Sequence, residues 1–207
     1  MSETTREKLT RVRLVHDSTP EDPREHQGTL CVISHVDRWT PASEIIASLI
    51  QRTKLWIALE NLNFDIDPEY DPDDLPNLYE GAVLAQWLEM VKDELLVEVF
   101  DTGHRDSDRY VAHVSREGCE GNAPWEDMPA IMASEIETFT QWAEGEVYGV
   151  VIEEADPPES EDDEPEWAEV DSCWGFYGDD PFTNGMSGHV PEQLHGQLRQ
   201  CEVEYEY

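Results

Sequence analysis

Apolar and polar residues alternate with a period of two in several short segments, and this pattern predicts β-strands. The alternating segments are 11–16, 110–115 and 201–207, and the short apolar segments 28–34, 95–100 and 146–153, rich in valine, isoleucine or leucine, also predict strands. Segments 11–16 and 28–34 flank the turn-forming string Pro20-Glu-Asp-Pro23, so together they predict an opening hairpin. In 170–177, alternation would place Val170, Ser172, Trp174 and Phe176 on one face and Asp171, Cys173, Gly175 and Tyr177 on the other.

Three other segments carry apolar residues at helical spacing and predict helices over 41–59, 77–93 and 129–145. The first begins at Thr40-Pro41, a capping residue followed by proline, and the last ends at Gly145, a residue typical of helix C-termini. The elements together predict one α+β domain over 1–207, with a mostly antiparallel sheet and about three helices.

An acidic, proline-containing stretch over 154–168 separates the last two long strands. It has too few apolar residues to bury, so we expect a flexible acidic loop within the domain.

Net charge sets this sequence apart, because 48 acidic residues face 13 basic ones and give a formal charge of -35. Such a chain lacks the basic clusters that bind phosphates, so direct nucleic-acid binding and anionic membranes are not expected. The charge fits either a basic protein partner or adaptation to molar salt, in which repulsion between carboxylates is screened. Lysine occurs only at Lys8, Lys54 and Lys92, and this bias also fits a halophilic origin.

The string Ser172-Cys173-Trp174-Gly175 resembles the nucleophile motif of papain-like proteases. Those enzymes carry their catalytic His and Asn roughly 130 to 150 residues downstream, whereas here the chain after Cys173 runs only to Tyr207. We therefore interpret Cys173 as a structural residue of a strand. The four cysteines are far apart with no Cys-x-x-Cys pair, so they are expected to be reduced.

Candidate metal ligands occur in two places: His26, Cys31 and His35 near the start, and Asp101, His104, Asp106 and Asp108 in a central loop. Neither spacing is diagnostic of a metal site. The chain also lacks a Gly-rich phosphate loop and the common hydrolase motifs, so no cofactor is expected. The first residues form no signal peptide, which predicts a cytoplasmic protein, within the host cell if it is viral.

Two strings resemble a family of small uncharacterised proteins encoded by phages, archaeal viruses and related mobile elements. Asp22-Pro-Arg-Glu25 followed by Gly28-Thr-Leu-Cys-Val-Ile-Ser-His35 is similar to the family's opening. Glu146-Val-Tyr-Gly-Val-Val-Ile-Glu153, with Val170-Asp-Ser-Cys-Trp-Gly-Phe-Tyr-Gly178, is similar to its closing hairpin. In the middle, Phe100-Asp-Thr-Gly-His104 departs from the family's Tyr-Asp-His-Ser-Gly by displacing the histidine. The resemblance implies fold and provenance but no activity.

Two hypotheses of function follow. In the first, the chain is a non-enzymatic accessory protein whose polyanionic surface binds a host protein that handles nucleic acid or acts in defence. Glu202, Glu204 and Glu206 would repeat at roughly 6.7 Å along a strand, close to the phosphate spacing of DNA. Aromatic residues beside the acids would complete the interface: Trp167, Tyr205 and Tyr207. In the second, a halophile-adapted metal-binding protein or hydrolase uses Asp101, His104, His35 and Cys173.

Overall fold

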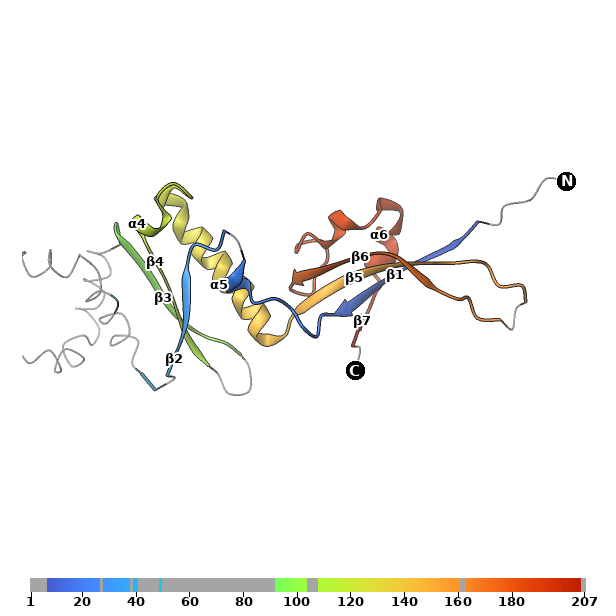
Figure 1. Ribbon diagram of the computed structural model, residues 1–207, viewed down its shortest axis with the longest axis horizontal. Helices are drawn as coiled ribbons and strands as arrows, with labels where there is room; N and C mark the ends of the chain where they lie inside the picture. The colour runs from blue at the N-terminus through green and yellow to red at the C-terminus, as the bar shows by residue number, and fades with distance from the viewer. Residues whose placement is uncertain are drawn as a thin grey trace, which may run out of the picture. The chain divides into compact units, whose positions relative to one another are not determined.

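The structure is a computed structural model that describes residues 7–26, 28–37, 39–40, 49, 92–103, 108–160 and 163–205. The chain divides into two compact units, and each is described by itself (Figure 1). Unit 1 comprises Met1–Pro23 and Gln141–Tyr207, and unit 2 comprises Arg24–Thr140. The single domain predicted over 1–207 stays a prediction. The helices predicted over 41–59 and 77–93 fall outside the described residues apart from Leu49, Lys92 and Asp93.

Unit 1 contains a four-stranded sheet with the order β6-β5-β1-β7. Its strands are β1 (Leu9–His16), β5 (Val147–Ala155), β6 (Ala168–Tyr177) and β7 (Val203–Glu204). The pairs β1–β5 and β5–β6 are antiparallel, whereas the short pair β1–β7 is parallel. Unit 2 contains a three-stranded antiparallel sheet with the order β2-β4-β3. These sheets and the helices confirm the predicted α+β class.

The predicted opening hairpin is wrong, because β1 and β2 belong to different sheets. The physical reason lies in β5, which is buried at nearly every position and therefore needs a neighbour on each side. β1 takes one side along its whole length, from Leu9 opposite Ala155 to His16 opposite Tyr148. The long connection after β1 also exceeds the few residues of an ordinary hairpin turn.

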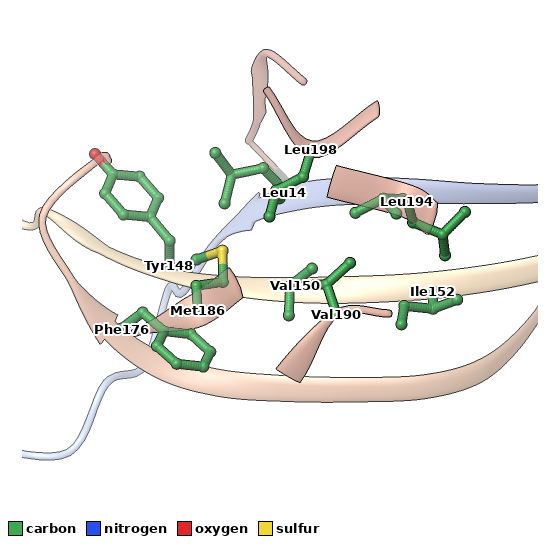
Figure 2. Packing of buried hydrophobic residues seen from close by; sticks show 10 residues of the cluster. Leu14, Tyr148, Val150, Ile152, Phe176, Met186, Val190, Leu194 and Leu198 are labelled. Carbon is green, nitrogen blue, oxygen red and sulfur yellow. The ribbon is translucent and has the colours of Figure 1, made fainter. Parts of the chain in front are cut away.

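The core of unit 1 lies on one face of its sheet, as Figure 2 shows. Val12 and Leu14 of β1, Val150 of β5 and neighbouring apolar side chains pack there against the segment 186–198. That segment consists of η4 (Met186–His189), η5 (Glu192–Leu194) and α6 (His195–Leu198). Met186 and Leu198 are almost completely buried, and each contributes about 1.5 to 3 kcal/mol of hydrophobic stabilisation.

Strand β6 departs from the predicted alternation in its second half. Val150 of β5 pairs with Cys173, but Tyr148 pairs with Phe176, so β6 carries one residue more than its partner between these pairs. Gly175 takes up the extra residue in a left-handed conformation with φ of 84°. This bulge turns Phe176 into the core on the same face as Cys173, whereas the sequence had placed them on opposite faces.

Unit 2 builds its sheet from β2 (Val32–Val36), β3 (Leu95–Asp101) and β4 (Arg109–Ser115), which continues into α4 (Arg116–Cys119). Phe139 of the long helix α5 (Met128–Glu144) contacts Phe100 and Tyr110 edge-on. β2 starts four residues later than predicted. The reason is Glu135 of α5, whose carboxylate accepts the backbone N–H groups of Leu30 and Cys31 at 2.8 Å each, so these groups are not available to a strand.

The helix predicted over 129–145 is confirmed by α5. Gly145 ends it in a left-handed conformation with φ of 78°, where its N–H donates to the Trp142 carbonyl. Within the described residues, none of the helices has the length and apolar character needed to cross a bilayer.

Candidate interaction surface

The face of the unit 1 sheet opposite the core carries a mixed ionic and aromatic surface, here called the outer face. Alternation along the central strands puts Arg11, Arg13, Gly149, Val151 and Glu153 on this face. Strand pairing adds side chains from the two flanking strands, because Ser172 lies opposite Val151 and Glu169 lies opposite Glu153. Glu204 of β7 joins them beside Val15.

A compact ion-pair network crosses the outer face. Glu153 is only 8% exposed, and its two oxygens accept Arg11 Nε at 2.5 Å and Arg13 Nη1 at 3.4 Å. Arg13 also donates from Nε and Nη2 to Glu204 Oε2 at 2.8 and 2.6 Å, and this hydrogen bonding lowers the pKa of Glu204. The burial of Glu153 is tolerated because two guanidinium groups satisfy its charge.

Trp167 completes this network, since the guanidinium of Arg11 lies 4.3 Å from the centre of its ring. The sequence predicted Trp167 as an aromatic residue of an interface. In the structure this ring already makes a cation–π contact with Arg11 of its own chain, and Arg11 also pairs with the buried carboxylate of Glu153.

Trp174 lies on the outer face of the edge strand β6, against Gly149. A Cβ added to Gly149 would come within 2.5 Å of Cδ2 and 2.7 Å of Cζ3 of the indole, and closest to Cε3 between them. An approach through the ring edge would leave the two flanking atoms much farther away, so the flat face of the indole covers Gly149. The opposite face of the ring points away from the sheet, and Trp174 is 45% exposed.

The connection between β5 and β6 is densely acidic. We call residues 156–171 the acidic arm; it has nine acids and no Lys or Arg. In Figure 1 the connection extends beyond the end of the unit 1 sheet. The described acids of the arm are all exposed: Asp156, Glu159, Asp163, Glu164, Glu166, Glu169 and Asp171. The sequence placed this loop at 154–168, and the strands leave 156–167 between them.

The C-terminal strand is shorter than its alternating pattern predicted, because β7 contains only Val203 and Glu204. Cys201 and Val203 pack against the core and Glu204 faces the opposite side, as alternation requires. Glu202 is exposed, and the exposed Tyr205 has its ring 5.2 Å from that of His16. Glu206 and Tyr207 lie outside the described residues. Since Glu204 is bound by Arg13, the expected row of phosphate-like carboxylates has one member whose charge is already compensated.

The residues predicted for a metal-binding or hydrolase site do not form one cluster among the described residues. Asp101 accepts Arg109 Nε at 2.8 Å and Nη2 at 3.1 Å, which lowers the pKa of Asp101, and His35 Nε2 lies 3.5 Å from Asp108. His35 and Asp101 belong to unit 2, whereas Cys173 belongs to unit 1, and His104 lies outside the described residues. The described part of the chain contains no group of three His, Cys, Asp or Glu side chains suited to a metal ion.

Cys173 and Cys31 lie in environments typical of structural cysteines. Cys173 packs against the apolar core of unit 1, as its interpretation as a strand residue requires. Cys31 is buried, and this burial raises the pKa of its thiol, with a further contribution from Glu135. A thiol held in its protonated form is a poor metal ligand and a poor nucleophile.

Sequence reasoning missed Trp174 as a surface residue. The signal was available in Gly149, a glycine inside a strand of otherwise large apolar residues, because such a glycine marks a close approach by another group.

Comparisons of the chain with protein-family models, with curated proteins and with solved structures find no match.

Proposed function

We propose that this chain is a non-enzymatic acidic accessory protein of a virus or mobile element, and that it binds a basic, nucleic-acid-handling host protein. The provenance rests on the sequence resemblance described above. The acidic arm is the surface that meets the partner, in place of the terminal row of glutamates from which the sequence argued.

One observation carries this proposal: Lys8 and the β1 cations Arg11 and Arg13 form their ion pairs with acids outside the acidic arm. Lys8 pairs with Glu154, Arg11 with Glu153, and Arg13 with Glu153 and Glu204. Among the described residues, none of the arm's acids forms an ion pair with a Lys or Arg. The arm therefore presents uncompensated charge to solvent, as the surface of a DNA mimic would.

The arm has a geometry that fits a basic cleft. It joins two strands whose other ends are held in a packed sheet, so its carboxylates are presented on a supported hairpin. A protein that normally contacts DNA phosphates offers Lys and Arg groups spaced for a polyanion, and the arm's charge would attract such a protein and increase the association rate.

The test is a pull-down from lysate of the source organism at its own ionic strength, with and without excess duplex DNA. Proteins that bind DNA should be retained by the wild-type chain and displaced by the duplex. The arm variant Asp163→Asn, Glu164→Gln, Glu166→Gln should lose them. A control that removes the same charge from unit 2, Glu120→Gln, Glu126→Gln, Glu137→Gln, should retain them.

The salt-adaptation hypothesis makes the opposite prediction, since it explains the same charge without a partner. Equal retention of proteins by the wild-type chain, the arm variant and the unit 2 control would refute the proposal. It would leave screening of the surface by salt as the account of the charge.

A further inference from the structure

Trp174 has the features of a binding residue that is already held in place. Its inner face rests on Gly149, where only the absence of a side chain leaves room for the ring. The bulge at Gly175 separates it from Phe176, which anchors the strand in the core. Side chains re-aimed by bulges are a common device at functional surfaces, because the strand on either side stays fixed.

The surroundings of Trp174 are acidic. Ser172, two positions away on the same face, donates its hydroxyl to Glu169 Oε1 at 2.7 Å and so holds that carboxylate along the strand. Ser172 and Trp174 are two residues apart, which is roughly 6.7 Å along a strand. One long cationic side chain can therefore reach both the Trp174 indole and the carboxylate that Ser172 holds. Val170 is a second extra residue of β6, between the pairs Ile152–Asp171 and Glu153–Glu169, and its 52% exposed side chain adds an apolar contact.

The outer face already contains one cation that contacts an indole and a carboxylate at the same time. Arg11 lies over the Trp167 ring at 4.3 Å and pairs with the carboxylate of Glu153. Ser172 holds the Glu169 carboxylate two strand positions from Trp174, so Trp174 also has a carboxylate on the same face. Within the part of the chain that the structure describes, no cation contacts Trp174.

We infer that the exposed face of Trp174 receives an arginine or lysine side chain of the basic partner, with Glu169 as its counter-ion. This inference rests on the proposed function and names the central contact of its interface. An indole is the aromatic ring that binds cations best, and arginine uses such faces most often. In high salt, where ion pairs between exposed groups are weak, a flat apolar contact gives the complex its persistence.

The test uses a defined probe, a fluorescently labelled peptide of six Gly-Arg repeats, titrated by anisotropy at 0.2 and 1 M KCl. Trp174→Ala should weaken binding roughly 3- to 20-fold at both salt concentrations. Trp174→Phe should recover part of that loss, because a phenyl ring binds cations less well. Trp39→Ala, which removes an exposed indole of unit 2, should leave the affinity unchanged.

The arm variant separates this inference from the proposed function. It should weaken binding strongly at 0.2 M KCl and much less at 1 M KCl, since its contribution is screened. Peptide binding that depends on the arm but not on Trp174 would overturn the inference and leave the proposed function intact. A wild-type protein that does not bind the peptide at either salt concentration would overturn both. If Trp174→Ala instead dissociates a dimer, the occupant is a second copy of this chain and the inference is wrong.

Discussion

The contact between Gly149 and Trp174 gives the sharpest prediction about the fold, through the substitution Gly149→Ala. The new Cβ would lie 2.7 Å or less from three ring atoms, whereas carbon atoms in contact are about 3.5 to 4.0 Å apart. The indole must therefore move. If it leaves the sheet entirely, the apolar area that it now buries limits the loss to about 2 to 3 kcal/mol, and a partial shift costs about 1 kcal/mol.

A double-mutant cycle with Trp174→Ala isolates this clash. Once the ring is gone, Gly149→Ala should be neutral or slightly stabilising, because alanine is favoured over glycine inside a strand by up to about 1 kcal/mol. Unfolding by urea at a constant 1 M KCl is the assay, since guanidinium would itself screen the acidic charge. Gly196→Ala, whose Cβ would meet open space, serves as the control and should not destabilise. Additive effects of the two substitutions would refute the ring placement.

Three further predictions concern stability. If the charge is an adaptation to salt, thermal stability should rise markedly between about 0.1 and 2 M KCl as self-repulsion is screened, whereas a protein equally stable in dilute buffer would leave partner binding as the better account. Cys173→Ser should cost about 1 to 2 kcal/mol in urea unfolding, whereas rapid selective alkylation of Cys173 at neutral pH would identify a nucleophile instead. The pKa of Glu204 is lowered in the folded state, so its contribution is complete above the ordinary value of 4.5 and is lost as the pH falls through the lower folded-state value. The stabilities of wild type and Glu204→Gln should therefore converge as the pH falls below 4.5, and a constant difference would show that the pair with Arg13 does not stabilise the fold.

Local sequence patterns correctly predicted several strands and one helix. β3, β4, β5 and α5 appear within two residues of their expected bounds, because their apolar periodicity and end signals agree. The start of β2 was misplaced, since it depends on Glu135, more than a hundred residues away in the chain. No local pattern contains such a contact.

The assignment of strands to sheets was also beyond local reasoning. The turn string after β1 suggested a hairpin with β2, yet the apolar run of β5 gives β1 a better partner. The bulge at Gly175 had the same effect on a smaller scale, because one extra residue reversed the face expected for Phe176.

The sequence predicted the acidic part of the candidate surface but not its side-chain contacts. Composition located the acidic arm, since its charge needs no tertiary information. It could not show that Arg13 binds Glu204 or that Arg11 covers Trp167, two contacts within the chain at residues that the sequence proposed for the interface. The position of Trp174, the residue inferred to contact the partner, depends on a strand glycine that leaves room for its ring.

Carboxylate labelling tests the central claim, that the acidic arm binds a basic partner which also binds DNA. The protein would be treated with a carbodiimide and a small amine in the heparin-binding fraction of the source organism's lysate, and the modified residues mapped by mass spectrometry. The account predicts that Glu164, Glu166 and Glu169 are protected in this fraction and that excess duplex DNA restores their labelling. Exposed acids of unit 2, such as Glu120 and Glu137, should react equally under both conditions. Full labelling of the arm in the absence of DNA would contradict the account.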